Sequence, residues 1–196
     1  MRWIRVWQSK SLSKDCFTSV TQTRPGRSST LFKMILVIVL FILVVYLGTI
    51  FFVTQDPLWF VSSFNEKPVH IVVYHDGEKS EYRVGDPGFE RLAEAIRQSL
   101  DQGVLRQSGI GMGEETLQEA YVKYVTVEAF FSHPVKLHAN FWTGQPVQML
   151  FPITGRHSEL GVVFLGEGGD YLVNPPALNT IQPLRTALAE LNFPVE

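Results

Sequence analysis

The chain is poor in cysteine, with Cys16 alone among 196 residues. A single thiol excludes a disulfide framework within the chain and any cysteine-rich zinc module. It also lacks an excess of charge of one sign, because 17 Lys and Arg stand against 19 Asp and Glu. This balance gives no reason to expect nucleic-acid binding.

Charged residues are absent from residues 34–55. Within this stretch residues 34–53 form an apolar run, in which 16 of 20 residues are Leu, Ile, Val or Phe. As a helix the run would be about 30 Å long, which matches the hydrocarbon core of a bilayer. A core helix of a soluble protein would be shorter and interrupted by polar residues. We therefore predict a single transmembrane helix over 34–53, with the lipid bilayer as its partner.

The residues at the end of the apolar run help to distinguish a cleaved signal peptide from a signal anchor that stays in the mature protein. A cleaved signal peptide has an apolar region of about 7–15 residues followed by small residues at the cleavage site. This run is longer and ends in Phe51, Phe52 and Val53. The pattern favours a retained signal anchor.

Acidic residues are nearly absent from residues 1–33, where seven Lys and Arg accompany Asp15 alone. Because basic residues beside a span resist translocation, we expect a cytoplasmic N-terminus and an extracytoplasmic C-terminal domain, at the plasma membrane. We also expect residues 1–33 to be disordered. Two alternatives stay open: residues 1–33 are a transit segment of an organellar inner-membrane protein, or translation begins at Met34.

A short linker over 54–66 is expected to precede a domain over 67–196. Two β-rich runs, 68–74 and 79–84, flank Asp76-Gly77, a pair that tolerates positive φ and predicts a hairpin. Asp86 and Pro87 then resemble a helix start. An apolar stripe follows at helical spacing and ends at Gly103; its residues are Phe89, Leu92, Ala93, Ile96 and Leu100.

The remainder of the domain is rich in short β-like runs. We predict a helical turn at 114–119, strands at 120–131, 135–142, 147–153, 160–165 and 171–174, and a final helix at 183–191. Short turns between strands favour antiparallel neighbours, since parallel strands need long crossovers. The predicted fold class is α+β, with an N-terminal transmembrane helix before a hairpin, a helix, an antiparallel meander and a C-terminal helix.

Motifs that carry chemistry are weak. Gly109, Gly111 and Gly113 follow a predicted helix and lack the Lys of a phosphate-binding loop, so we interpret them as a connector. The turn with Glu167 and Asp170 offers too few oxygen ligands for calcium.

Histidine and serine give no catalytic set either. The pairs His70/His75 and His133/His138 are spaced so that their members face opposite ways on a straight strand. Ser158 beside His157 lacks the Gly-x-Ser-x-Gly turn that exposes a nucleophile. We expect no metal and no cofactor, and no catalytic residue is assigned. Convergence of histidines from neighbouring strands stays open.

Apolar residues occupy both faces of several predicted strands, as at Phe130-Phe131, Phe141-Trp142 and 149–151. The surplus predicts a second covering layer, a self-association surface or contact with a membrane partner. The leading hypothesis is a non-catalytic interaction or regulatory module that binds a membrane or extracytoplasmic protein, with homo-oligomerisation open. The rival is a membrane-anchored hydrolase or small-ligand-binding domain, with its site built across the sheet.

Overall fold

The computed structural model describes residues 27–54, 56, 58, 60–61, 63–107 and 109–195. The chain divides into two compact units, Met1–Leu43 and Val44–Glu196, and each is described by itself. The predicted disorder of residues 1–33 falls mostly on residues 1–26, which lie outside the described residues.

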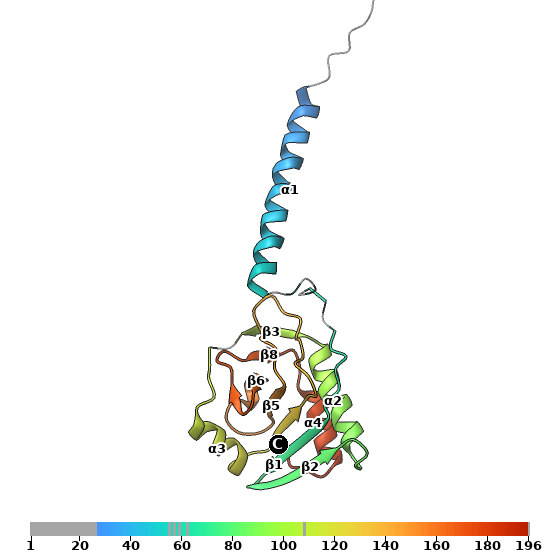
Figure 1. The fold of residues 1–196 in the computed structure, drawn as a ribbon, viewed down its shortest axis with the longest axis vertical. Helices are drawn as coiled ribbons and strands as arrows, with labels where there is room; N and C mark the ends of the chain where they lie inside the picture. Colours follow the sequence, from blue (N-terminus) through green and yellow to red (C-terminus); the bar gives the residue numbers. More distant parts are fainter. Residues whose placement is uncertain are drawn as a thin grey trace, which may run out of the picture. The chain divides into compact units, whose positions relative to one another are not determined.

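Helix α1 (Arg27–Thr54) is continuous and contains Thr30–Thr54, a stretch long and apolar enough to cross a membrane. Its large apolar side chains, among them Phe41 and Phe52, are exposed. Helix α1 begins before the uncharged run at Met34 and includes Lys33 (Figure 1). Within the part of the chain that the structure describes, no residue of the most apolar window is buried.

The second unit holds a six-stranded antiparallel sheet in the order β2-β1-β4-β5-β6-β7 (Figure 1), and the predicted α+β class is confirmed. The strands are β1 (His70–His75), β2 (Glu78–Arg83), β4 (Thr126–Phe130), β5 (Gln148–Pro152), β6 (Phe164–Glu167) and β7 (Asp170–Tyr171). A two-stranded sheet pairs β3 (Val104–Gln107) with β8 (Pro176–Leu178). The helices are α2 (Phe89–Asp101), α3 (Glu114–Lys123) and α4 (Gln182–Glu190), with a 3₁₀ turn at Ser158–Leu160.

The β1–β2 hairpin forms where predicted. Asp76 and Gly77 have φ values of 50° and 78°, and His75 pairs with Glu78 across the two-residue loop. Both central residues of such a turn need positive φ, which Asp tolerates and Gly adopts without strain.

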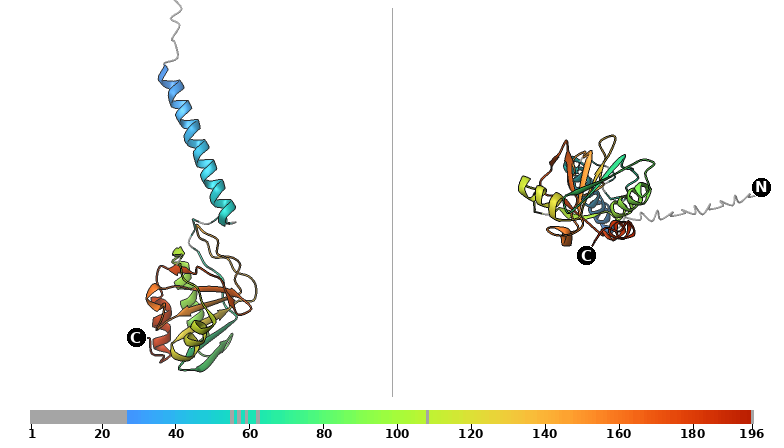
Figure 2. Two further views of the ribbon diagram at one scale, coloured as in Figure 1. Left: turned by 90° about the vertical axis from the view of Figure 1, so that its left-hand side faces the viewer. Right: turned by 90° about the horizontal axis from the view of Figure 1, so that it is seen from below.

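Two layers cover the six-stranded sheet. Helices α2 and α4 pack together on the face that carries Ile71, Val127 and Met149, whereas α3 lies over the opposite face (Figure 2). Leu150 and Phe164 form a smaller apolar cluster under α3. Full burial of each such side chain contributes roughly 1.5–3 kcal/mol, so both faces stabilise the domain. Of the apolar residues that the sequence placed on both strand faces, Phe131, Met149 and Phe151 belong to the main core and Leu150 to the cluster under α3, whereas Trp142 is exposed.

Helix α2 begins later than predicted. Its N-cap is Gly88, at φ 89°, and Phe89 is the first helical residue. The carboxylate of Asp86 instead accepts a hydrogen bond from the Arg83 backbone amide at 2.7 Å. Asp86 thus closes the turn after β2, because a short acidic side chain satisfies turn amides as readily as helix amides.

Helix α3 is longer than predicted, and the strand predicted over 120–131 is correspondingly shorter. Residues 120–123 are helical and β4 begins at Thr126. Leu117 and Tyr121, four residues apart, both pack against the smaller cluster. Glu114 at the start and Lys123 at the end also suit the helix dipole. Tertiary packing overrides the β propensity of this segment.

The predicted strand over 135–142 is wrong. Val135, Leu137 and Ala139 are buried at alternate positions, yet the segment belongs to an irregular loop over 131–147. Strand β4 already has β1 and β5 as its neighbours. An alternating apolar pattern shows only that one side of an extended segment is buried. To form a strand, the segment must also pair with the unoccupied edge of another strand.

The C-terminal strands also differ in position from those predicted. Strand β6 begins at Phe164 and β7 ends at Tyr171, whereas the predicted segments were 160–165 and 171–174. Strands β3 and β8 were not predicted, because each is short and finds its partner far away along the chain. Helix α4 matches its prediction, with Leu184, Ala187 and Leu188 buried.

Candidate functional site: a pocket beside Trp142

A buried carboxylate lies at the centre of the sheet face that α3 covers. Glu128 on β4 is only 4% exposed, and its β neighbours are Val72 and Leu150. A carboxylate buried among apolar side chains costs several kcal/mol unless hydrogen bonds replace its water. The structure therefore has to supply donors at this point.

Three tyrosines and one amide supply those donors. The hydroxyls of Tyr74 and Tyr121 each donate to Glu128 at 3.1 Å, one to each carboxylate oxygen. Gln148 Nε2 donates to Oε1 at 3.2 Å, and the Tyr171 hydroxyl also donates to Oε1. Both oxygens are satisfied, and the carboxylate joins β1, α3, β5 and β7.

The phenols remain donors over a wide pH range. Burial, followed by the negative charge of Glu128, raises the pKa of Tyr74 and of Tyr171 well above the usual value of 10. Burial likewise raises the pKa of Tyr121 to about 12, with Glu128 adding to the rise. A protonated phenol can donate a hydrogen bond, so the network keeps its donors at neutral pH.

The network also supports the turn between β6 and β7. Gln148 Oε1 accepts a hydrogen bond from the Gly169 backbone amide at 3.1 Å. Gly168 and Gly169 have φ values of 63° and 101°, which other residues rarely adopt. Tyr171 follows this turn, so Gln148 and Tyr171 hold the hairpin at two points.

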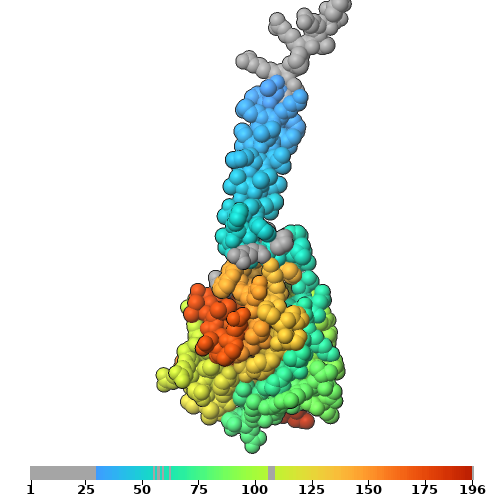
Figure 3. Space-filling view, viewed as in Figure 1, coloured from blue at the N-terminus to red at the C-terminus, as the bar shows by residue number. Residues whose placement is uncertain are grey.

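A pocket of about 340 Å³ lies between this hairpin and the 131–147 loop. Trp142 and Leu172 form apolar parts of its lining, and Glu167 and Asp170 supply its charged side chains. Figure 3 shows the segments near 140 and near 168 side by side on one surface of the domain. The remaining lining residues are Gly144, Gln145, Pro146 and Gly166.

Glycine is required at two points of this pocket. A Cβ on Gly166 would lie 2.4 Å from the backbone oxygen of Asp170. A Cβ on Gly144 would lie 3.0 Å from Leu172, at a φ of 68°. Side chains at these positions would fill the pocket or displace its walls.

The two carboxylates of the pocket oppose each other directly. Glu167 pairs with Asp170 across the hairpin, so their side chains lie on the same face. Within the described part of the chain neither has a basic partner. Like charges directly opposite destabilise a sheet. A bound cation would relieve this repulsion.

The aromatic wall suits the same ligand. Trp142 is 52% exposed, although large aromatic side chains usually bury most of their surface. An indole face attracts ammonium and guanidinium groups, by about 0.5–1 kcal/mol at exposed sites. Trp142 together with Glu167 and Asp170 can therefore hold an organic cation.

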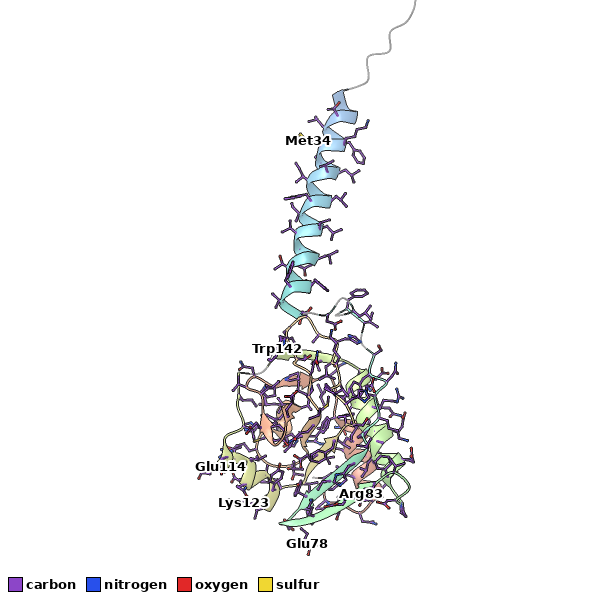
Figure 4. The ribbon with its side chains drawn as sticks, viewed as in Figure 1. Met34, Glu78, Arg83, Glu114, Lys123 and Trp142 are labelled. Atoms are coloured by element: carbon purple, nitrogen blue, oxygen red, sulfur yellow. The ribbon has the colours of Figure 1, made fainter. Side chains whose placement is uncertain are left out.

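A second hollow, of about 290 Å³, shares Trp142, Gly144 and Gln145 with the first. Its other lining residues include Thr54, the last residue of α1, and Lys136. Trp142 and Glu78, in the β1–β2 hairpin, lie at opposite ends of the domain (Figure 4). The second hollow brings Thr54 to the end that carries Trp142. The two hollows therefore adjoin at these shared residues, one lined by Glu167 and Asp170 and the other by Thr54.

The segment that follows Thr54 is fastened to the domain. Asp56 is buried, and its carboxylate lies 2.6 Å from His138 Nδ1 and 3.7 Å from Lys136 Nζ. Burial opposes ionisation, but the hydrogen bonds from His138 and the Leu58 amide hold the pKa of Asp56 below its usual value. Within the predicted linker over 54–66, Thr54, Asp56 and also Phe64 are buried.

The histidines considered as catalytic or metal ligands do not share a site. His70 lies near Glu81, His75 near Asp76, His133 near Glu66, and His138 near Asp56. His157 packs edge-on against Phe164, and burial lowers its pKa. Among the described residues, no group of three or more His, Cys, Asp or Glu side chains is placed to hold a metal ion.

The other two motifs have structural surroundings. The hydroxyl of Ser158 donates to the Gly155 carbonyl at 2.7 Å, which closes a turn. The loop with three glycines follows β3 and leads into α3, so the expectation that it follows a helix is wrong. Glu114 and Glu115 begin α3, however, and their charges repel a phosphate at that helix start.

A larger hollow of about 470 Å³ lies outside α3, beside Arg156. Both basic residues of this hollow already pair with one carboxylate, because Glu119 lies 3.1 Å from Lys123 and 3.8 Å from Arg156. The Trp142 pocket is the better candidate for a cation, since its lining holds two carboxylates and an aromatic ring and includes no basic residue.

Sequence reasoning did not identify Glu128 or its tyrosines. The one local signal is a single acidic residue inside the β-rich run 125–131. A charge in such a run is a candidate for burial with partners. Its partners lie at positions 74, 121, 148 and 171, and only the fold brings them together.

The fold and pocket define an α+β domain that follows an apolar helix. Comparison of the chain with models of protein families, with curated proteins and with solved structures finds no match.

Proposed function

We propose that the chain is a single-pass membrane protein whose extracytoplasmic domain binds a ligand through a cationic group held in the Trp142 pocket. The leading observation is the opposed pair Glu167 and Asp170 beside an exposed indole. The proposal makes the domain an interaction module and assigns it no catalysis.

The membrane part rests on α1 and on the charges that flank it. Its exposed apolar side chains suit lipid, since Leu, Ile, Val and Phe each favour insertion by about 0.3–0.6 kcal/mol. Residues 1–33 carry seven basic residues, and the first basic residue after α1 is Lys67. This asymmetry supports a cytoplasmic N-terminus, in the plasma membrane or, as the alternative, in an organellar inner membrane.

The binding part rests on charge and shape. Residues 54–196 carry ten basic and eighteen acidic residues, so the domain attracts cations before contact. The pocket adds two carboxylates without basic partners among the described residues, and an indole. A serine hydrolase would need a nucleophile next to a base, and Ser158 and His157 do not provide one, because the serine hydroxyl donates to a backbone carbonyl.

Fluorescence titration of the full chain in maltoside detergent tests the binding. Trp3, Trp7 and Trp59 are replaced by Phe so that Trp142 reports alone, and tetramethylammonium is added against sodium at equal ionic strength. We expect a saturable change that the E167Q/D170N variant loses. The variant E159Q, which removes an exposed carboxylate outside the pocket, should retain it. No saturable change, or an equal change in E167Q/D170N, overturns the proposal.

A further inference from the structure

The acidic pocket continues into the hollow that reaches α1. Trp142 and Gly144 line both, and Thr54 and Lys136 line the second. Lys136 lines the second hollow, Glu167 and Asp170 line the first, and Trp142 lines both. These charges complement a ligand that carries a negative group next to a positive group, with the negative group near the lysine and the positive group near the carboxylates.

Thr54 is the last residue of the helix proposed to span the membrane. A helix of about 20 apolar residues crosses the hydrocarbon core, and the headgroup layer lies just outside it. Thr30–Thr54 has 25 residues, so its last residue reaches that layer if the helix spans the membrane as proposed. The hollow lined by Thr54 then opens among lipid headgroups, and tryptophan is the residue most favoured there, with tyrosine.

The segment after Thr54 limits how far this surface can move from the helix end. The Thr54 hydroxyl accepts a hydrogen bond from the Asp56 amide at 3.1 Å, and the Asp56 carboxylate holds His138 in the 131–147 loop. Trp142 belongs to the same loop. The loop is therefore tied to the last turn of α1 through Thr54 and Asp56, which are buried, and through His138, which is partly buried.

From these placements we infer that the cation in the Trp142 pocket is the ammonium of a zwitterionic phospholipid headgroup, with Lys136 beside its phosphate. This inference rests on the proposed function and names its ligand. Glu167 and Asp170 face the ammonium, and Trp142 lies against it. Lys136 also lies 3.7 Å from Asp56, so its charge is shared between that carboxylate and the phosphate.

The test uses the full chain with Trp142 as its only tryptophan, in nanodiscs of two lipids. Phosphatidylcholine carries an ammonium, and digalactosyldiacylglycerol does not; both are uncharged overall. Acrylamide, a neutral quencher, measures the accessibility of Trp142. We expect roughly twofold weaker quenching in phosphatidylcholine, the size of one exposed cation–π contact. The E167Q/D170N variant should lose this difference, and E159Q should keep it.

The remaining outcomes separate the two proposals. Equal quenching in both lipids, with tetramethylammonium still bound in detergent, overturns the lipid ligand and leaves the cation pocket. In that case a soluble ligand or a basic protein segment is the ligand. A difference between lipids that persists in E167Q/D170N also overturns the inference, because insertion of Trp142 alone would then explain it. Loss of tetramethylammonium binding as well removes both proposals.

Discussion

Gln148 links the buried carboxylate of Glu128 to the hairpin that carries the pocket. Its amide nitrogen donates to Glu128 at 3.2 Å, and its amide oxygen accepts from Gly169 at 3.1 Å. A glutamine has both a donor and an acceptor, so it can join a carboxylate to a backbone amide, which a second glutamate cannot do. The core therefore positions the acidic turn.

Replacing Glu128 should destabilise the domain. The E128A variant leaves the Tyr74, Tyr121, Tyr171 and Gln148 donors without their acceptor, at a cost of about 2–5 kcal/mol. The E128Q variant keeps one acceptor oxygen and should lose about half as much. Thermal unfolding of the full chain in detergent, followed by near-ultraviolet circular dichroism, measures the difference. Equal stability of E128A and the unaltered chain would contradict the network.

The tyrosines predict a loss of stability at alkaline pH. The pKa of Tyr121 rises from 10 to about 12 on folding, so the folded chain holds its proton more tightly than the unfolded chain. Tyr121 therefore contributes stability below pH 10, and the contribution is lost as the pH rises from 10 towards 12. Unfolding temperatures across this range should fall less steeply in Y121F. A parallel decline in both chains would count against the assignment.

Much of the fold follows from local patterns, and the site does not. Asp76-Gly77 predicts its hairpin, and the stripe from Phe89 to Leu100 predicts its helix, because turn geometry and helical spacing are properties of neighbouring residues. The end of α3 at Lys123 depends on contacts that Tyr121 makes with distant residues. Local patterns carry no information about such contacts.

The pocket is likewise formed by contacts between residues far apart in the chain, so local sequence patterns do not predict it. The sequence places Trp142 in a predicted strand and counts it in the apolar surplus that predicts a covering layer or an interaction surface, but it does not place the indole beside acidic residues. Its loop and the 167–170 turn come together because β5 lies between β4 and β6 in the sheet. Opposition of Glu167 and Asp170 is visible only once their strands are placed in register.

Asp56 and His138 should be energetically coupled. The D56N and H138A variants are each expected to lose about 1–3 kcal/mol, and the double variant less than their sum. Because the folded pKa of Asp56 is depressed, its ionised form contributes stability above pH 3.8, which is lost as the pH falls through the folded value. The gap between D56N and the unaltered chain should then narrow below pH 3.8. If the difference in free energy of unfolding between D56N and the unaltered chain did not change with pH, the destabilisation would come from packing and not from the charge of Asp56.

Topology can be tested with the natural thiol. Cys16 is the sole cysteine and precedes α1. If the N-terminus is cytoplasmic, an impermeant maleimide should label Cys16 only after the cells are opened. In a C16S background, a cysteine that replaces the exposed Glu159 should react in intact cells. The reverse pattern would overturn the orientation, and labelling of neither in intact cells would favour an organelle.

The opposed carboxylates of the pocket should lower the stability of the domain and strengthen its binding of tetramethylammonium. Replacing one of two directly opposed carboxylates removes a repulsion, so D170N should stabilise the domain by about 0.2–1 kcal/mol. The same change should weaken tetramethylammonium binding by about two- to fivefold, as expected for one weak electrostatic contact. Added salt should shrink the gain in stability, because it screens the repulsion in the unaltered chain. The E159Q variant controls for net charge and should change neither quantity. Lower stability together with weaker binding in D170N would mean that Asp170 holds the hairpin together, and the opposed pair would then need no ligand to explain it.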